Sequence, residues 1–257
     1  MDLISAVIIT HNEERNIARC LSSLKEVADD IVVVDAASTD NTAAIVAQHG
    51  ARVVNREWTD YSDQKNFANG IALHKYILSM DADESLSPAL RKEILDRKKQ
   101  GLKGAFRFPR ITNYCGSWVK HGGWYPDAKI RLFPRDAARW EGSHVHEELK
   151  LDPGVKIIDI NADLLHYSYH SIGDHLQRID RYSTLHAQKM FAAGRSAGPI
   201  KLYFSPLAKF IQGYFFQLGF LDGTAGFNIA RISAKAVRSK YKKLKQLHDR
   251  TSVIGNA

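Results

Sequence analysis

The sequence has few cysteines and no long apolar run, and each shortage excludes a class of protein. Among 257 residues there are only two cysteines, Cys20 and Cys115, which lie far apart and form no CxxC pattern. We therefore expect neither a disulfide framework nor a cysteine zinc site, and a reducing cytosol is the simplest compartment. No uncharged apolar run reaches the roughly 18–20 residues that a membrane span needs. The longest run, residues 210–221, is bounded by Lys209 and Asp222.

Other signals are absent as well. The N-terminus carries acids around a short apolar run, not a basic region before an apolar core, so we expect no signal peptide. The sequence contains neither GxGxxG nor GxxxxGKS/T, which argues against a dehydrogenase and a P-loop protein. A GxSxG match at residues 194–198 follows a helical pattern and precedes Pro199. It therefore predicts a loop between helices and not a nucleophile elbow.

The composition is that of a basic globular protein. Hydrophobic residues make up 44% and charged residues 25% of the chain, which excludes a disordered or collagen-like protein. Lys and Arg number 36 against 28 Asp and Glu, a formal charge of +8. This excess favours an anionic partner, which leaves nucleotide phosphates, nucleic acid and an acidic membrane surface open.

The first 85 residues alternate strand-like and helix-like patterns. Short apolar runs typical of buried strands occur at residues 3–10, 31–34, 52–54 and 76–80. Helical spacing or capping signals mark the segments between them, at residues 16–24, 42–48 and 62–72. Continuous apolar strands that alternate with helices predict an α/β fold with a mainly parallel central sheet covered on both faces.

Polar clusters follow three of these strands, at residues 10–13, 35–40 and 81–84. Parallel sheets bind ligands beyond the carboxyl ends of their strands, so we expect one shared site. If the chain is extended there, Asp81 and Asp83 point the same way. Two close carboxylates repel unless a cation lies between them, and Mg²⁺ or Mn²⁺ suits carboxylate and phosphate oxygens. The alternative is a solvated loop that caps the next helix.

The pattern changes after this region. Ser87 and Pro88 start a basic helix that runs to about Gln100, and residues 104–169 combine glycines, aromatics and short β patterns. We expect a mixed sheet extension there. From residue 171 the chain is helical, so we place a domain boundary at residue 170 and a helical extension over residues 171–257.

The helical extension combines aromatic residues with cations. Residues 200–232 are dense in apolar and aromatic side chains, and residues 231–245 carry seven Lys and Arg. An apolar face flanked by Lys and Arg suits the plane of an anionic bilayer, so we favour a membrane-associating extension. The alternative is an amphipathic helix pair packed on the core or on a second subunit, with a solvated basic face.

Three segments resemble the family 2 glycosyltransferases in order and spacing: Val7 to Glu13, Val33 to Thr42 and Leu78 to Glu84. Later segments are similar to one branch of that family, the lipopolysaccharide-core β-glucosyltransferase type: residues 123–127, 131–133, 145–148, 166–169 and 219–223. The resemblance implies the GT-A type of nucleotide-diphospho-sugar transferase fold, with residues 1–170 as the catalytic domain. It also implies inverting transfer of a hexose, with glucose as first choice, from a UDP-sugar to a lipid-linked acceptor.

The resemblance also implies roles for residues at the strand ends. Thr10, Asn12 and Glu13 would line the nucleotide pocket, and Asp35 would hold the uracil ring or the ribose. Ala37 and Asn41 stand where glycines are more common in the family, and these small changes leave the role of Asp35 in place.

Further along, the resemblance implies contacts to the phosphates. Lys65 and Asn66 would reach the base or the phosphates. Asp81 would contact the ribose or the water shell of the metal, and Asp83 would ligate the metal. We expect Arg131 to pair with the diphosphate, with an ordinary exposed salt bridge as the alternative.

Transfer needs a base for the acceptor hydroxyl and stabilisation of the departing diphosphate. Glu147 is the first choice for the base, Asp127 the second and Glu148 the third. His146 or His166 would complete the metal shell, because neutral imidazole suits Mn²⁺. The alternative for each histidine is an ordinary hydrogen-bonded position.

Two other functions are weighed against this one. A nucleotidyltransferase would need a glycine-rich, basic phosphate loop after the first strand, and residues 10–14 supply none. A non-catalytic basic module that binds nucleic acid or a membrane has no need of paired acids at strand ends. We therefore expect an enzyme without a nucleic-acid partner, in the cytoplasm and peripheral on the inner face of the cytoplasmic membrane.

Overall fold

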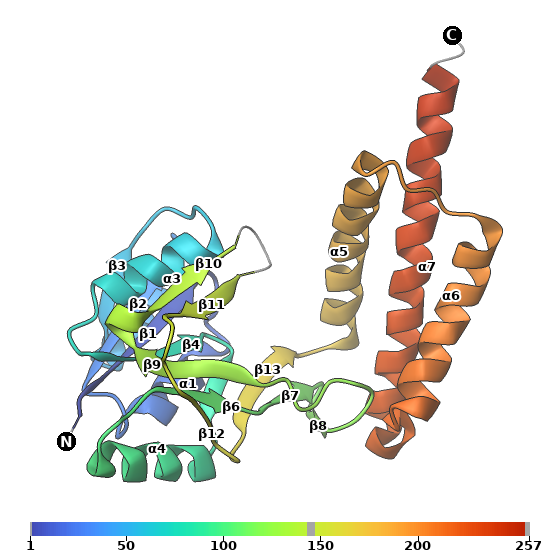
Figure 1. Cartoon of the computed structure of the whole chain (residues 1–257). Coiled ribbons are helices and arrows are strands. Elements are labelled where there is room, and N and C mark those ends of the chain that lie inside the picture. The colour runs from blue at the N-terminus through green and yellow to red at the C-terminus, as the bar shows by residue number, and fades with distance from the viewer. Residues whose placement is uncertain (1, 143–146, 255–257) are drawn as a thin grey trace. The chain divides into compact units, whose positions relative to one another are not determined.

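The computed structural model describes residues 2–142 and 147–254, with side chains described as far as residue 249. The chain divides into two compact units (Figure 1). The first comprises Met1–Ile111 and Asp127–Tyr167, and the second comprises Thr112–Pro126 and Ser168–Ala257. The helical unit therefore includes an earlier segment, residues 112–126, besides the helices that the sequence predicts.

A seven-stranded sheet forms the centre of the first unit, in the order β12-β6-β9-β4-β1-β2-β3. Strands β4, β1, β2 and β3 are parallel, β9 is antiparallel to both β4 and β6, and β12 is parallel to β6. The strands are β1 (Ile4–Thr10), β2 (Asp30–Asp35), β3 (Arg52–Asn55), β4 (Tyr76–Asp81), β6 (Ala105–Phe108), β9 (Lys129–Pro134) and β12 (Ile157–Asp159). The predicted mainly parallel sheet is confirmed.

Helices cover both faces of this sheet, which explains the continuous apolar strands. Helices α1 (Ile17–Leu24), α2 (Thr42–Gln48) and α4 (Pro88–Gln100) contribute to one hydrophobic core. Helix α3 (Tyr61–Gly70) and the hairpin of β10 (Ala138–Glu141) and β11 (Glu148–Leu151) contribute to the other. Along β1, alternate residues belong to the two cores, because successive side chains of a strand point to opposite faces.

Two helix starts follow directly from the sequence. Ser87 accepts a hydrogen bond from the Leu90 N–H (3.1 Å), and Pro88 occupies the first turn of α4, as predicted. Asp60 caps α3 by accepting from the Asp63 N–H (2.9 Å). This cap fixes the start of the helix that carries two predicted site residues. Strand β5 (Glu84–Leu86) follows β4 after a turn and pairs antiparallel with β13 (Leu164–Tyr169).

The second unit consists mainly of three long helices. Helices α5 (Ile172–Ala192) and α6 (Pro199–Ile211) both pack against α7 (Gly223–Ile254) (Figure 1). Residues 194–198 connect α5 to α6, as predicted. The unit also contains β8 (Ser117–Val119), which pairs with residues 112–114 of β7 (Arg110–Tyr114). None of the helices in the described part of the chain is both long and apolar enough to cross a membrane.

The apolar segment at residues 200–232 is not one helix. Helix α6 ends at Ile211, and a π-helical turn (Gln212–Phe216) and a 3-10 turn (Gly219–Asp222) lead into α7. The close approach of backbone explains the glycines here, because a Cβ on Gly226 of α7 would collide with the carbonyl oxygen of Gly219. The basic residues 231–245 continue α7 and form no separate helix.

Candidate active site

The carboxyl ends of three neighbouring strands lie side by side at one edge of the central sheet. Thr10, the last residue of β1, pairs with Asp35, the last residue of β2. On the other side of β1, Ile9 pairs with Asp81, the last residue of β4. Strand β9 runs antiparallel to β4, so its first half, with Arg131, reaches the same edge. The prediction that the polar segments share one edge of the sheet is confirmed.

Asp81 belongs to a network of ion pairs. Arg131 Nη2 lies 2.5 Å from Asp81 Oδ2 and 2.5 Å from Glu84 Oε1. Arg110 Nη1 lies 2.9 Å from the same Glu84 oxygen. The Glu84 side chain is fully buried, and its second oxygen accepts a hydrogen bond from the Asp81 N–H. Buried charges are stable only when paired and hydrogen-bonded, so each of these four side chains depends on the others.

The surrounding cations determine the charge state of Asp81. Burial by itself raises the pKa of a carboxyl group. The positive charges of Arg131, Lys65 and Arg110 outweigh that effect and hold the pKa of Asp81 well below its usual range. Asp81 is therefore ionised at any physiological pH, and its carboxylate orients the three cations.

Lys65 connects Asp81 to the first-choice base. The lysine lies on α3 and is 3% exposed. Its Nζ is 3.1 Å from Asp81 Oδ1 and 3.3 Å from Glu147 Oε1. The same ammonium lies 4.5 Å from the centre of the Trp140 ring, a cation–π contact. The structure thus brings together three predicted site residues from distant parts of the sequence.

Asp83 faces a different partner from Asp81. A turn follows Asp81, so the segment is not extended as we expected. The charge of Asp81 still acts on Asp83, and their convergence on one ligand stays a prediction. His166 Nε2, on β13, lies 3.2 Å from Asp83 Oδ2. Burial raises the pKa of Asp83, but the hydrogen bond and charge of His166 outweigh it, so the pKa lies below its usual value.

The Asp83–His166 pair fits a divalent ion. One carboxylate and one imidazole face each other, and Mg²⁺ or Mn²⁺ takes its other ligands from phosphates and water. Asp81 does not fit the same role, because both its oxygens face cations. Within the described residues, no group of three His, Cys, Asp or Glu side chains is placed to hold a metal. His146, the other predicted ligand, lies outside the described residues.

The predicted nucleotide ligands after β1 and β2 hold two loops together. Asn12 has a positive φ of 55°, and its Oδ1 accepts a hydrogen bond from the Thr39 N–H (2.8 Å). Its own N–H donates to Ser38 Oγ (2.8 Å). Asp35 is 2% exposed, and both its oxygens accept hydrogen bonds from Ser38. The carbonyl oxygen of Glu13 accepts the first hydrogen bonds of α1. Their contact with a nucleotide stays a prediction.

Thr10 and Asn66 differ in how far they are available to a ligand. The Thr10 hydroxyl is buried at the end of β1 without a hydrogen-bond partner among the described residues. A ligand that reaches this edge can supply one. The Asn66 amide instead donates to the Trp140 carbonyl (2.8 Å) and accepts from the Trp140 N–H (2.9 Å). Asn66 therefore fixes β10 against α3, and its contact with a base or phosphate stays a prediction.

The second and third choices for the base are already paired with cations. Arg110 donates to Asp127 Oδ2 through Nε (3.0 Å) and Nη2 (2.5 Å). Lys129 Nζ lies 2.9 Å from the other Asp127 oxygen. Burial raises the pKa of Asp127, but the charge of Arg110 and hydrogen bonds from both cations outweigh it, so its pKa is lowered. Glu148, on β11, is exposed and pairs with Lys150 (2.6 Å).

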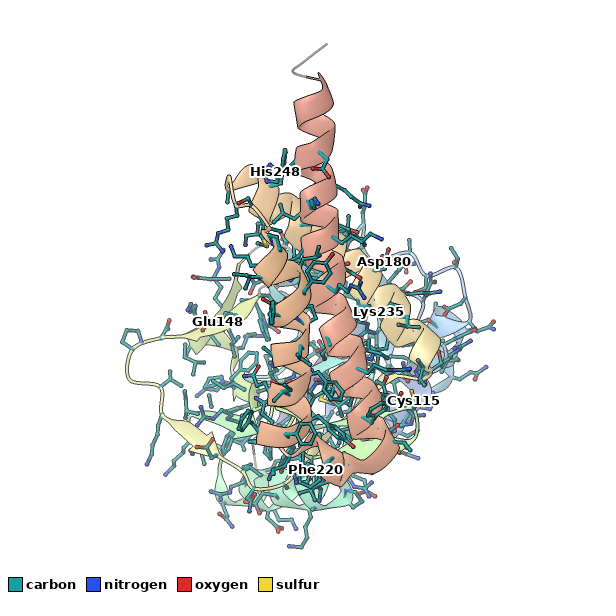
Figure 2. All side chains as sticks on the ribbon, turned by 90° about the vertical axis from the view of Figure 1, so that its right-hand side faces the viewer. Cys115, Glu148, Asp180, Phe220, Lys235 and His248 are labelled. Carbon is teal, nitrogen blue, oxygen red and sulfur yellow. The ribbon has the colours of Figure 1, made fainter. Side chains whose placement is uncertain are left out.

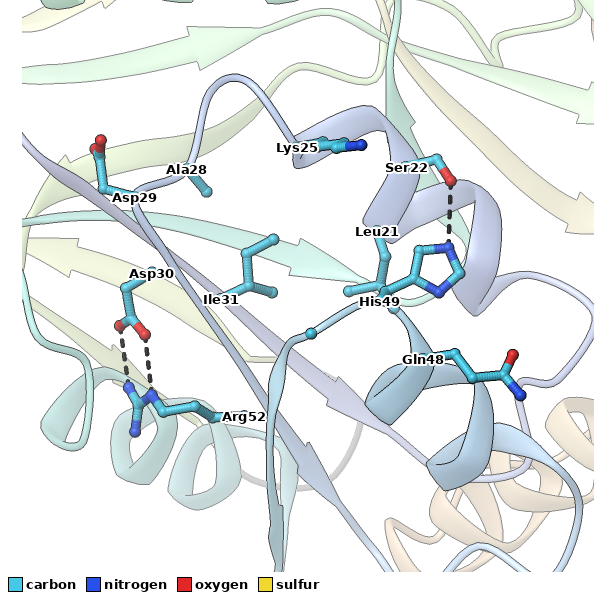
Figure 3. Close-up of a pocket in the computed structure, with 11 residues that line it drawn as sticks. Leu21, Ser22, Lys25, Ala28, Asp29, Asp30, Ile31, Gln48, His49 and Arg52 are labelled. Atoms are coloured by element: carbon cyan, nitrogen blue, oxygen red, sulfur yellow. Dashed lines mark hydrogen bonds and ion pairs between the residues drawn. The ribbon is translucent and has the colours of Figure 1, made fainter.

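Two hollows lie in the first unit, and neither is lined by the acids at the strand ends. The larger, about 570 Å³, lies at the amino ends of β2 and β3, opposite the edge that holds Asp81 (Figure 3). There Asp30 pairs with Arg52 (3.0 Å), and His49 approaches the Ser22 hydroxyl (3.4 Å). A second hollow, of about 420 Å³, lies beside α3 and β10. Strand direction and charge therefore identify the site better than hollow size does.

Three members of the charged cluster were not predicted from the sequence: Glu84, Arg110 and Lys129. Glu84 directly follows the paired acids and belongs to the same polar cluster, so the sequence marks its position. Arg110 stands in a stretch without a recognisable motif, and its contacts to Glu84 and Asp127 join residues from different strands. No local signal could have identified Arg110.

A mainly parallel sheet with this charged cluster beyond its strand ends agrees with the fold that the resemblance to the family 2 glycosyltransferases implies. The profile of the Glycosyl transferase family 2 matches residues 5–148, more than half of the chain. The chain belongs to glycosyl transferase family 2. This membership decides in favour of an enzyme that transfers sugars and against both alternative functions.

Relatives match over nearly the whole chain. An uncharacterized glycosyltransferase of Rickettsia typhi is 31% identical and aligns over 96% of this chain and 88% of its own length. The lipopolysaccharide core biosynthesis glycosyltransferase LpsC of Rhizobium meliloti is 30% identical over 95% of this chain and 93% of its own. The solved structure of glucosyl-3-phosphoglycerate synthase from Mycobacterium tuberculosis, in complex with Mn²⁺ and UDP, is 16% identical. It covers 64% of this chain and 72% of that one, with a TM-score of 0.47.

Proposed function

We propose that this glycosyltransferase moves a hexose, with glucose as first choice, from a UDP-sugar to a lipopolysaccharide-core or other lipid-linked acceptor, with inversion. The similarity to LpsC supports the lipopolysaccharide-core acceptor. The motifs after β1, β2 and β4 support a nucleotide-sugar donor. One observation carries the proposal: Thr10, Asp35 and Asp81 end adjoining strands, and Arg131 reaches the same edge.

The charge balance of the site supports a divalent ion. Five carboxylates belong to the cluster: Asp81, Asp83, Glu84, Asp127 and Glu147. Four cations accompany them: Lys65, Arg110, Lys129 and Arg131. A diphosphate bound there would need added positive charge. Asp83 and His166 would hold the Mg²⁺ or Mn²⁺ ion that supplies it. Arg131 and Lys65 are the cations of this chain placed to help.

Glu147 is the proposed base for the acceptor hydroxyl. Within the described part of the chain, Lys65 is the cation that binds its carboxylate, which is partly exposed. Asp127 is a weaker proton acceptor, because two cations bind it and its pKa is lowered. Proton removal by Glu147 makes the hydroxyl nucleophilic as the sugar–phosphate bond breaks on the opposite side of the anomeric carbon. Lys65 orients Glu147 relative to Asp81.

A lipid-linked acceptor places this reaction at a membrane surface. We infer that the enzyme works at the inner face of the cytoplasmic membrane, where nucleotide sugars are available, and that an anionic membrane is a partner. The helical unit, residues 112–126 and 168–257, is the part of the chain that we assign to this contact.

Donor hydrolysis tests the proposal. With Mn²⁺ present, the protein should slowly release UDP from UDP-glucose, and Asp83→Ala should abolish this release. Asp136→Ala is the matched control, because Asp136 is exposed on a surface turn of the same unit. Equal rates in wild type and Asp83→Ala would refute the assignment. A thermal-shift comparison of UDP-, GDP- and dTDP-sugars then identifies the donor, because a bound ligand stabilises the fold.

A further inference from the structure

Helix α6 is apolar on two sides. One side packs against α7 and includes buried Pro206. On the other side, large apolar residues recur every three or four positions and are exposed: Ile200, Tyr203, Phe204 and Leu207. Ile200 is 72% and Phe204 66% exposed. A helix that is hydrophobic all round is normally covered on all sides, so this face calls for a second apolar environment.

The exposed face continues into the turn between α6 and α7. Five further side chains are exposed there: Phe215, Phe216, Leu218, Phe220 and Leu221. Phe216 is 81% exposed, and Phe220 marks this end of the helices in Figure 2. We call these five residues, together with the four on α6, the apolar face. Monomeric proteins rarely expose so many large apolar residues in one place, and such patches mark interaction sites.

The turn is held in place by other parts of the same unit. Asp222 accepts hydrogen bonds from the N–H groups of Lys120 (3.2 Å) and His121 (2.8 Å). Its Oδ1 also contacts the His121 ring nitrogen Nδ1 at 2.9 Å. The Gly122 N–H donates to the carbonyl oxygen of Gln217 (2.8 Å). The exposed side chains of the turn are therefore presented by a fixed backbone.

The charge of this region has one sign. Residues 199–248 contain nine Lys and Arg and a single acid, Asp222. This gives the segment a formal charge of +8, equal to that of the whole chain. Asp222 is nearly buried and accepts hydrogen bonds from residues 120 and 121, so the exposed charges of this segment are cations. The remainder of the chain is electrically balanced.

The exposed cations lie on one face of α7. Five exposed residues recur every three or four positions: Arg231, Lys235, Arg238, Lys242 and Lys245. We call them the basic stripe; Figure 2 labels Lys235. The stripe begins beside an exposed aromatic residue, because the Arg231 guanidinium lies 6.0 Å from the ring centre of Phe227. Lys243 differs, since it binds the Asp180 carboxylate (2.6 Å) and two hydroxyls of α5.

We propose that the apolar face and the basic stripe together dock on an anionic lipid bilayer. Large apolar side chains next to Lys and Arg match the acyl boundary and the charged headgroups. Nucleic acid would use the cations but leave Ile200, Leu207 and Leu221 uncovered. A second copy would bring the same positive charge to the contact. This proposal rests on the proposed function, because a lipid-linked acceptor gives the enzyme a reason to bind a membrane. It adds which surface of the protein meets that membrane.

Flotation with lipid vesicles tests the apolar face. The full chain is mixed with vesicles of phosphatidylcholine alone or with phosphatidylglycerol, without a sugar donor. Wild type should float with the anionic vesicles. The triple variant Tyr203→Ser/Phe204→Ser/Phe216→Ser should bind at least about tenfold more weakly, because it loses three inserted rings. The control, Leu73→Ser/Leu185→Ser, removes two exposed leucines outside this face and should bind like wild type.

A charge variant tests the basic stripe. Lys235→Gln/Arg238→Gln/Lys242→Gln should weaken binding to anionic vesicles by about a hundredfold at low salt. It should change little on neutral vesicles. The matched control takes three exposed lysines of the first unit, Lys92→Gln/Lys99→Gln/Lys103→Gln, and should bind like wild type.

Three results would overturn this proposal. The first is that wild type does not bind anionic vesicles. The second is that the apolar variant binds them as well as wild type does. The third is that wild type does not bind vesicles but forms a dimer in light scattering, whereas the apolar variant is a monomer. In the last case the occupant is a second copy. Donor hydrolysis by the apolar variant should equal that of wild type, so failure of docking and failure of the proposed activity are distinguishable.

Discussion

Lys65 Nζ lies 3.3 Å from Glu147 Oε1, although 82 positions separate the two residues in sequence. The lysine comes from α3, which covers one face of the central sheet, and the glutamate immediately precedes β11. The same ammonium group holds Asp81 at 3.1 Å. The buried Lys65 ammonium therefore sets the distance between Asp81, at the end of β4, and Glu147, the proposed base.

Replacing this cation should reduce transfer more than donor binding. Lys65→Met keeps the length of the side chain but leaves Glu147 without its partner, while Asp81 keeps Arg131. We expect kcat for transfer to fall at least about a hundredfold. The dissociation constant for UDP, measured by calorimetry, should change less. Arg52→Met, which breaks a pair far from the site, is the control. An unchanged kcat would remove Lys65 from the site.

Glu147→Gln should separate binding from chemistry. The amide preserves shape but cannot take the acceptor proton, so transfer should fall by about 10²–10⁴-fold while UDP-sugar binding is retained. Glu148→Gln, on the neighbouring exposed residue, should leave both unchanged. Loss of binding as well as transfer in Glu147→Gln would show that the residue is structural.

Glu84 should matter for stability. Its buried carboxylate receives Arg110 and Arg131, so Glu84→Gln leaves two cations undercompensated. We expect a loss of about 3–5 kcal/mol in the free energy of unfolding, measured with denaturant. Glu93→Gln breaks a surface pair with Arg97 and should cost about 0.5 kcal/mol or less. Equal small losses in both variants would mean that the network contributes little to the fold.

The helical unit should lose stability in mild acid. Burial, aided by the charge of Arg178, lowers the pKa of His175 to about 4, whereas the unfolded chain has the usual value near 6.5. Between these values the unfolded state binds the extra proton, so stability falls as pH drops, by up to about 3 kcal/mol. Unfolding followed at several pH values should show this slope.

His175→Asn provides the control for the pH effect. The asparagine can still accept the hydrogen bond that joins His175 to the Tyr114 hydroxyl (2.9 Å), but it does not titrate. The variant should be less stable overall and should show a smaller slope between pH 4 and 6.5. Slopes that match in both proteins would assign the acid sensitivity to another group.

The edge of the sheet that carries the polar clusters was predictable, because strand ends are encoded locally. The apolar runs at β1, β2 and β4 each stop at a polar cluster, and parallel pairing brings those ends together. The conformation of residues 81–83 was not predicted correctly, because the chain turns after Asp81 where the sequence favours an extended segment. Arg110 was missed because its partners come from other strands and leave no periodic trace in the sequence.

The helical unit shows a similar limit. Helical periodicity predicted α5. The composition of residues 200–245 showed that the later helices are aromatic and basic. It did not predict that residues 112–126 join this unit, because that association rests on contacts such as Asp222 with Lys120 and His121. The break at residues 212–222 was marked in sequence only by scattered glycines. Such contacts join residues that are far apart in sequence, and the helix or strand propensity of each segment does not predict them.

The concentration of positive charge in residues 199–248 has a practical consequence for handling the protein. A catalytic fragment that ends before this segment has nearly equal numbers of acids and bases, so its isoelectric point falls close to neutrality. Such a fragment should pass through a cation-exchange column that retains the full chain at low salt. It should also precipitate more readily near pH 7, because its molecules no longer repel one another.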